Sequence, residues 1–275
     1  MEITCLFFVL ATISSTGMGY RSDEFICKRI TNDMKDLDTN FAGDNYHVAE
    51  KDGNSMTETK SDILKTYARD CLELYDKGEK RDGIYKVSPD DGCPIRVYCD
   101  MTNGGWTVMQ RRKDGSVSFK RTWAEYVEGF GDLEGDYWLG LNQIHRLTKD
   151  GSQIYIHLQQ YDGKWLYAHY KDFTVNNAVT AYKMNVDKYG FEGTTPEFLG
   201  YHDNMKFSTY DRDNDNYAGS CSFYHGDCGW WFNTCYRFNP NGMYNNKNVN
   251  GLSYYSDDYI YMKNSVIKLK RNKHC

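Results

Sequence analysis

The stretch NMKFSTYDRDNDNYAGSC, residues 204–221, places Asp211, Asp213 and Asp215 at alternate positions ahead of Cys221. Alternating carboxylates in a loop often hold a hard cation, because Ca²⁺ takes about six to eight oxygen ligands, some of them backbone carbonyls. A solvated acidic turn uses the same residue types, since Asp and Asn are common in turns. The rest of the chain has to decide between a cation site and a plain turn.

The neighbouring segment, DCGWWFNTC (227–235), contains two adjacent tryptophans, Trp230 and Trp231. Adjacent side chains point in different directions, so one ring can pack inward while the other faces a ligand. Both rings can equally belong to the core. The segment therefore predicts either an aromatic binding surface or a packed loop beside the acidic stretch.

Composition narrows the class of protein. The 275 residues carry a formal charge of -5, so no basic field favours a nucleic-acid partner. Tyrosine is abundant, with 24 residues, and its polar-tipped ring can both pack and present a binding surface. Neither G-x-S-x-G nor H-E-x-x-H occurs, so we predict a binding protein and not an enzyme.

The N-terminus predicts secretion. Residues 1–19 contain an apolar core from Ile3 to Ile13 and end in small residues, which is typical of a cleaved signal peptide. No other stretch is apolar and long enough to be a membrane span. Removing the signal peptide leaves eight cysteines, an even number that favours disulfides in an extracellular protein. A zinc site is not favoured, because no C-x₂-C pair is present.

Residues 20–68 are polar and hold few aromatic residues, unlike the rest of the chain. Their apolar residues from Ile26 to Phe41 recur at helical spacing over about two heptads, with Cys27 among them. One interpretation is a short oligomerisation segment held by a Cys27 disulfide between chains. The other is a linker, and residues 42–62 have the composition of one.

Residues 69–275 have the density of a globular domain of the α+β class. We predict a short helix over 121–131, with a capping box formed by Thr122 and Glu125, and a second helix capped by Asn142. Alternating apolar and polar residues predict strands at 105–112, 153–161, 164–175 and 265–271.

Several long motifs in this region carry a resemblance to a known family. They are CLELYDKG (71–78), GGWTVMQRRKDGSVSF (104–119), YVEGFGDLEGDYWLGLNQIHRLT (126–148), the opening stretch, GWWFNTC (229–235) and NGMY (241–244). In this order they resemble the fibrinogen-related domain, the C-terminal globular module of fibrinogen chains, ficolins, tachylectins and angiopoietins. The resemblance runs from about Asp70 to Arg271. No collagen-like Gly-X-Y segment is present.

The resemblance implies a small N-terminal subdomain, a central mixed sheet with short helices, and a loop-rich C-terminal subdomain that binds calcium and ligand. It also implies that the last strand, 265–271, returns to the central sheet. Carried over by position, the Ca²⁺ ligands are the side chains of Asp213 and Asp215 and the carbonyls of Tyr217 and Gly219.

The disulfides expected from the resemblance are Cys71–Cys99 and Cys221–Cys235. If the last strand runs back toward the N-terminal subdomain, Cys275 emerges near Cys93, and we predict that this pair is also bonded. Cys27 and Cys228 are then candidates for bonds between chains.

A ligand pocket is implied beside Thr234-Cys235, where the family has a cis peptide bond. In acetyl-binding relatives the exposed amides there hold the acetyl oxygen, and aromatic rings enclose its methyl group. Tyr236 stands where a histidine is common, and the 245–251 loop is short. The predicted ligand-binding residues are Tyr224, His225, Trp230, Thr234, Cys235, Tyr236, Tyr254 and Tyr259.

The function predicted first is a secreted, calcium-stabilised lectin that binds acetylated or related glycans, with a role in innate immune recognition. The alternative is a module that grips a protein ligand, as in fibrinogen and angiopoietins. A single sugar site is usually weak, so a lectin gains from a homo-oligomer, which is the role that Cys27 would serve.

Overall fold

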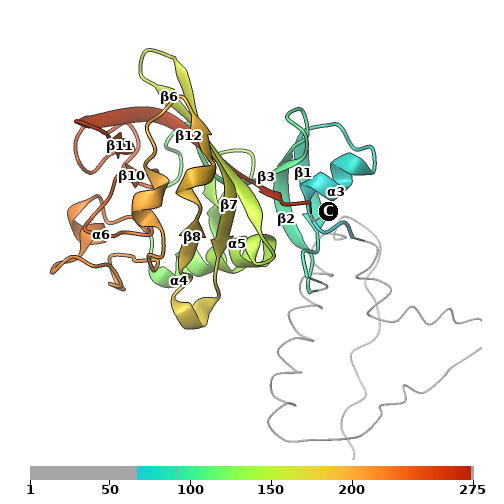
Figure 1. Ribbon diagram of the computed structural model, residues 1–275, viewed down its shortest axis with the longest axis horizontal. Helices are drawn as coiled ribbons and strands as arrows, with labels where there is room; N and C mark the ends of the chain where they lie inside the picture. The colour runs from blue at the N-terminus through green and yellow to red at the C-terminus, as the bar shows by residue number, and fades with distance from the viewer. Residues whose placement is uncertain (1–66, 91, 274–275) are drawn as a thin grey trace, which may run out of the picture. The chain divides into compact units, whose positions relative to one another are not determined.

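A computed structural model of the chain describes residues 67–90 and 92–273 (Figure 1). The predicted signal peptide, the helical pattern around Cys27 and the last cysteine, Cys275, lie outside the described residues. The described residues are those of the globular domain.

One antiparallel sheet organises the domain, in the strand order β1-β2-β3-β12-β6-β7-β8. Its strands are β1 (Gly83–Val87), β2 (Ile95–Asp100), β3 (Trp106–Arg112), β12 (Tyr259–Arg271), β6 (Ser152–Gln160), β7 (Trp165–Val175) and β8 (Met184–Val186). Shorter strands extend it: β4 (Phe130–Gly131), β5 (Tyr137–Trp138), β9 (Phe191–Gly193), β10 (Phe238–Asn239) and β11 (Ser253–Tyr255). Every pairing between these strands is antiparallel, so the prediction of a mixed sheet was wrong in that detail.

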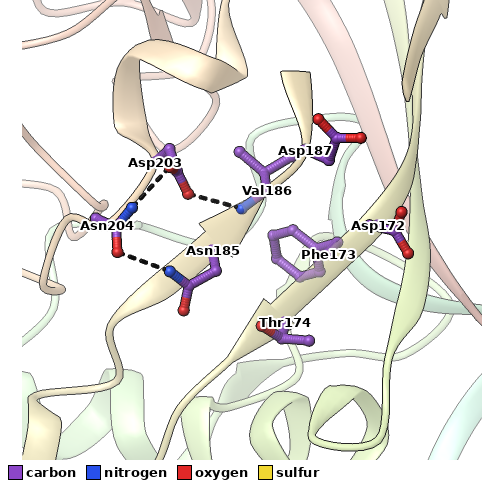
Figure 2. A pocket seen from close by; sticks show the side chains of 8 residues that line it. All are labelled: Asp172, Phe173, Thr174, Asn185, Val186, Asp187, Asp203 and Asn204. Atoms are coloured by element: carbon purple, nitrogen blue, oxygen red, sulfur yellow. Dashed lines mark hydrogen bonds between the residues drawn. The ribbon is translucent and has the colours of Figure 1, made fainter. Parts of the chain in front are cut away.

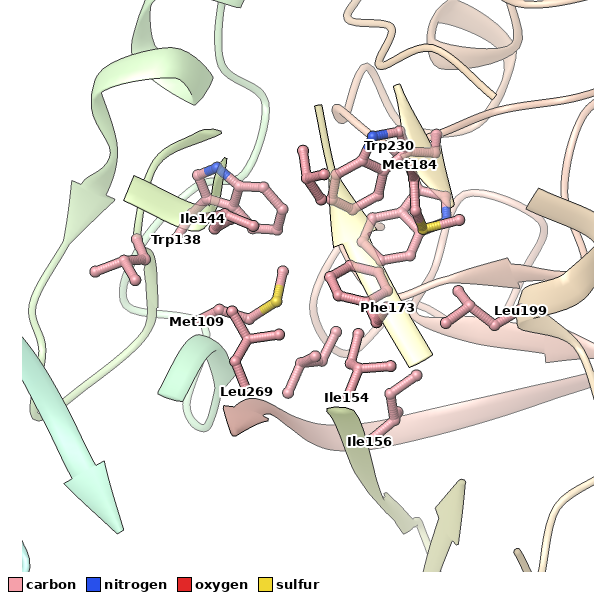
Figure 3. Close-up of a cluster of buried hydrophobic side chains, with 14 of the residues drawn as sticks. Met109, Trp138, Ile144, Ile154, Ile156, Phe173, Met184, Leu199, Trp230 and Leu269 are labelled. Atoms are coloured by element: carbon pink, nitrogen blue, oxygen red, sulfur yellow. The ribbon is translucent and has the colours of Figure 1, made fainter. Parts of the chain in front are cut away.

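The four predicted strands are confirmed as β3, β6, β7 and the end of β12, and β6 shows the expected alternation whereas β3 is buried almost throughout. In β6, Ile154, Ile156 and Leu158 are buried while the residues between them are partly exposed. The buried side of the sheet packs against rings from the C-terminal loops, and Figure 3 shows the sheet residues Ile154, Ile156 and Phe173 in one cluster with Trp230. The core therefore joins the sheet to the C-terminal loops.

Two of the helices test sequence predictions. Helix α4 (Trp123–Glu128) begins with the predicted Thr122–Glu125 capping box. Helix α5 (Leu141–Thr148) begins two residues earlier than predicted, with Gly140 at its N-cap. The prediction that Asn142 caps it was wrong, because the Asn142 amide oxygen accepts a 2.6 Å hydrogen bond from the Tyr182 hydroxyl. The other helices of residues 67–273 that the structure describes are α3 (Cys71–Asp76), α6 (Cys221–Tyr224) and three 3₁₀ turns, η1 (Ala178–Thr180), η2 (Lys188–Gly190) and η3 (Leu199–His202).

Gly140 starts α5 for a steric reason. Its φ is 102°, a value that favours glycine, and a Cβ there would lie 2.6 Å from the Glu128 carbonyl oxygen. The chain turns too tightly between β5 and α5 for a side chain that would cap the helix.

Strand β12 connects the two ends of the domain (Figure 1). It begins beside β11 among the C-terminal loops and pairs with β3 and β6 in the middle of the sheet. At its end the Arg271 guanidinium lies 2.8 Å from the Asp70 carboxylate, next to α3. The prediction that the last strand returns to the sheet is confirmed, although the strand starts at Tyr259 rather than at residue 265.

Candidate functional site

The acidic loop before α6 is held by its own aspartates. Asp211 accepts a 2.9 Å hydrogen bond from the Trp123 backbone N–H and so ties the loop to the start of α4. Asp215 accepts from the backbone N–H groups of Tyr217, at 2.9 Å, and Cys221, at 2.8 Å. Asp213 accepts from the Asp215 N–H at 3.1 Å. Asp211 thus serves the fold, whereas Asp213 and Asp215 lie together within the loop.

The oxygen atoms of this loop fit a hard cation. Burial raises the pKa of Asp215; its two backbone hydrogen bonds oppose this rise, and the neighbouring Asp213 carboxylate adds to it. The Tyr217 and Gly219 carbonyls accept no hydrogen bond from any described residue. No group of three or more His, Cys, Asp or Glu side chains in the described ranges could hold a metal, so a cation here would need carbonyl and water ligands as well.

A disulfide joins the acidic loop to the tryptophan segment. Cys221 and Cys235 are bonded, with their Cα atoms 5.3 Å apart. The peptide bond just before Cys235, Thr234-Cys235, is cis, as the resemblance implied. Cys221 opens helix α6, whose N-cap is Ser220, so the disulfide places α6 directly beside the cis bond.

A pocket of about 330 Å³ lies at this junction. We call it the tyrosine pocket; it is lined by Tyr217, Tyr224, His225, Thr234, Cys235, Tyr236 and Tyr259. Three separate segments supply these residues: the acidic loop with α6, the segment around the cis bond, and the start of β12. Six of the eight predicted ligand-binding residues are therefore brought together.

The lining residues of the tyrosine pocket carry no formal charge. Burial lowers the pKa of His225, although its hydrogen bond to the Val249 carbonyl, at 3.1 Å, opposes that shift. The Tyr236 hydroxyl donates to the same carbonyl at 2.8 Å, and burial raises the pKa of this phenol. His225 and Tyr236 also meet edge to face, with ring centroids 4.8 Å apart. The pocket wall is neutral near pH 7 and is fixed by the 245–251 loop.

The sequence of these segments matches one protein family. The profile of the fibrinogen beta and gamma chains, C-terminal globular domain, matches residues 67–270. The chain belongs to this family. Membership makes the fibrinogen-like domain a binding module rather than an enzyme, in agreement with the sequence prediction.

Two human proteins match this chain over most of its length. Human angiopoietin-related protein 7 is 36% identical over 242 residues, which cover 83% of this chain and 68% of the relative. Human fibrinogen-like protein 1 is 39% identical over 242 residues, which cover 80% and 77%. The chain spans 60% of bovine angiopoietin-related protein 7, so a relative's full activity does not transfer by similarity alone.

Solved structures agree with the fold. The fibrinogen-like globe domain of human ANGPTL2 superposes with a TM-score of 0.69 at 31% identity, covering 75% of this chain and 100% of that chain. Lamprey fibrin D-dimer, complexed with the peptide ligand Gly-His-Arg-Pro-amide, gives a TM-score of 0.65 at 26% identity and covers 93% and 87%.

Two predicted ligand-binding residues do not reach the tyrosine pocket. Trp230 is fully buried, and Tyr254 is 6% exposed with its ring stacked on Phe198. Trp231 is also fully buried, so the idea that one tryptophan faces a ligand was wrong. The reason is that both rings fill the space between the sheet and the C-terminal loops. Tyr217, expected only as a carbonyl ligand, also adds its ring to the pocket, which no sequence pattern indicated.

The cysteines of the fibrinogen-like domain mostly match expectation. Cys71–Cys99 is bonded, and Cys93 is also in a disulfide, while its predicted partner Cys275 lies outside the described residues. Cys228 is a free, fully buried thiol that donates to the Asn239 amide oxygen at 3.2 Å, and burial raises its pKa to about 12. The proposal that Cys228 bonds to another chain was therefore wrong, because no second chain can reach it.

An acidic hollow of about 290 Å³ lies between β7, β8 and the turn after η3 (Figure 2). Its lining includes Asp172, Asp187 and Asp203. Asp203 already accepts hydrogen bonds from the Val186 N–H, at 2.9 Å, and the Asn204 amide, at 2.7 Å. We assign no ligand to this hollow. No helix in the described part of the chain is long and apolar enough to cross a membrane.

Proposed function

We propose that this fibrinogen-like domain is a secreted recognition module that binds a protein ligand through the tyrosine pocket and its aromatic rim. The observation that carries the proposal is the rim itself. Phe223 is 65% exposed, Tyr224 55% and Tyr217 45%, and these three rings contact one another in a row. Across the pocket, Tyr255 is 38% exposed and touches Tyr259.

This rim is larger than a single sugar needs. A monosaccharide would fill the pocket and leave Phe223 in water. Protein interfaces, in contrast, are enriched in Tyr and Phe and surround a central anchor with further apolar contacts. The lamprey fibrin D-dimer, which is complexed with a peptide ligand, supports the same class of partner. The neutral lining of the pocket suits an uncharged anchor group, since a buried charge would find no counter-ion there.

A glycan is the second candidate ligand. The pocket volume of about 330 Å³ is near the lower end for small-molecule sites, and the cis bond at Thr234-Cys235 lies in its wall. An acetylated sugar with its methyl group against the tyrosine rings would match this arrangement. The predicted role in innate immune recognition applies only if the ligand is a glycan.

Substitutions on the aromatic rim distinguish a protein ligand from a glycan ligand. Peptides are first selected on the wild-type protein from a phage-displayed library. We expect Tyr259→Ala and Phe223→Ala each to lower the affinity for these peptides by at least about tenfold, because both substitutions remove interface anchors. The affinity for N-acetylglucosamine, measured by calorimetry, should fall in Tyr259→Ala but not in Phe223→Ala. Tyr189→Ala, which removes an 88% exposed ring on η2, serves as the control and should change neither.

The two candidate ligands give opposite results in this comparison. If no peptide can be selected while N-acetylglucosamine binds and depends on Tyr259, the lectin takes first place. If Phe223→Ala binds every selected peptide as the wild type does, the rim has no part in recognition.

We also propose that Ca²⁺ binds the acidic loop through the Asp213 and Asp215 carboxylates and the Tyr217 and Gly219 carbonyls. Asp213→Asn keeps the side-chain shape but removes a charge, so the rise in melting temperature on adding calcium should largely vanish. Asp211→Asn should lower the melting temperature equally with and without calcium, because Asp211 bonds Trp123. Equal loss of the calcium response in both variants would contradict the assignment.

The disulfides and the signal-like N-terminus support secretion. A homo-oligomer held by Cys27 remains a prediction, since that residue lies outside the described part of the chain. Two linked pockets would raise the avidity for a repetitive partner without any new contact.

A further inference from the structure

A second pocket lies at the end of β3 and shares no lining residue with the tyrosine pocket. Its volume is about 280 Å³. Arg112, the last residue of β3, forms part of its lining and is only 1% exposed. We call it the Arg112 pocket.

The guanidinium of Arg112 has donors to spare. Nη1 donates to the Pro240 carbonyl at 3.2 Å and to the Gly242 carbonyl at 2.7 Å. Nε is buried without a partner, and Nη2 donates to no described residue. An arginine offers five N–H groups in one plane, and the Phe119 ring covers one face of that plane, 3.9 Å from Cζ.

No carboxylate in the described residues is hydrogen-bonded to this cation. Asp136 exerts the largest charge effect on it, but the Asp136 oxygens accept hydrogen bonds from the backbone N–H groups of Lys113, Asp114 and Gly115. Burial lowers the pKa of Arg112, and the Asp136 charge opposes that shift. Burying a cation whose donors lack partners costs free energy of folding. An acceptor that enters the pocket can therefore form hydrogen bonds with N–H groups that are already in place.

The rest of the pocket suits a small anion with an apolar body. Val117, Phe119, Met243 and Tyr244 supply apolar walls. Lys120 also lines the pocket, and its ammonium lies 2.8 Å from the Asp227 carboxylate. No carboxylate lines the pocket, and Arg112, unlike Lys120, has no carboxylate hydrogen-bonded to it among the described residues. The cavity is smaller than most drug-sized sites.

We propose that the Arg112 pocket binds a carboxylate group carried by a small organic acid or by the C-terminal residue of a peptide. The planar guanidinium matches a carboxylate better than it matches a neutral group. Such a ligand would enter independently of anything held in the tyrosine pocket, so the fibrinogen-like domain would carry two recognition sites of different charge preference.

Ligand-observed NMR titration of the whole secreted chain tests this assignment. N-acetyl-leucine and its amide represent a peptide end, and glucuronate and methyl glucoside represent a sugar acid. We expect at least one acid to bind at least about tenfold more tightly than its neutral partner. The pair that shows the difference identifies the source of the carboxylate. Equal binding of acid and neutral partner in both pairs, or no binding of either acid, would overturn the proposal.

A matched pair of charge substitutions locates the site. Ser118 is exposed and lines the pocket, so Ser118→Glu places a competing carboxylate there without touching the buried arginine. Ser116→Glu adds the same charge in the same loop but outside the lining. Acid binding should fall at least about tenfold in Ser118→Glu and stay near wild type in Ser116→Glu and in Tyr259→Ala. The same loss in both serine variants, or a loss in Tyr259→Ala, would show that the acid binds elsewhere.

Discussion

Replacing Trp231 by alanine is expected to destabilise the fibrinogen-like domain by about 4 kcal/mol, a large share of an ordinary domain's stability. The ring is fully buried, with centroids 4.9 Å from Trp230 and 5.1 Å from Phe207. Its indole N–H donates to the Tyr182 carbonyl at 2.7 Å. Alanine would leave a cavity between the sheet and the C-terminal loops, together with an unpaired buried carbonyl.

Two further variants make this measurement specific. Trp165→Ala removes a ring that is 43% exposed on β7, and it should cost less than about 1 kcal/mol. Trp231→Phe keeps most of the volume and should fall between the two. Urea unfolding followed by circular dichroism, with the disulfides intact, gives each value. A loss at Trp231 no larger than at Trp165 would contradict the view that this ring is central to the core.

The second large effect is acid destabilisation through His202. This ring is fully buried, and its Nδ1–H donates to the Trp231 carbonyl at 2.7 Å. Nε2 accepts from the backbone N–H groups of Arg237, at 3.2 Å, and Phe238, at 3.1 Å. Burial lowers the pKa of His202 to about 4, and the nearby Arg237 charge adds to this while the bond to Trp231 opposes it. The native fold therefore requires the neutral ring.

The sign of the pH effect is set by that pKa. Above about pH 6.5 the ring is neutral whether the chain is folded or not, and His202 adds no pH dependence. Below that value the unfolded chain binds a proton that the folded chain refuses, so stability falls until about pH 4. A shift from 6.5 to about 4 corresponds to a loss of about 3 kcal/mol.

His202→Gln provides the comparison, because an amide can donate and accept but does not titrate in this range. The variant should be less stable at neutral pH, and its disadvantage should shrink as the pH falls from about 7 to about 4. Unfolding free energies across this range measure the difference. Parallel curves for the two proteins would show that His202 does not contribute to the acid sensitivity.

Local features of the sequence determined the parts of the fold that depend on neighbours in the chain. The alternation in SQIYIHLQQ specifies which side of β6 is buried, since a strand exposes successive residues on opposite sides. The Thr122–Glu125 capping box marks the start of α4, because its hydrogen bonds span only three residues. The ordered motifs from residue 71 to residue 244 were specific enough to indicate the family, which the match over residues 67–270 confirmed.

Only the tertiary structure decided which side chains face a ligand. Trp230, Tyr254 and Cys228 are buried because the C-terminal loops pack against the sheet, and that contact involves residues far apart in the sequence. Tyr217 lines the tyrosine pocket because the Cys221–Cys235 bond folds its loop toward the cis peptide and β12. The spare donors of Arg112 were equally invisible in the sequence, since Asp136 turns its oxygens to the 113–115 backbone instead. Side-chain spacing along the chain fixes periodicity, but the walls of a cavity come from separate segments whose orientation is set by long-range packing.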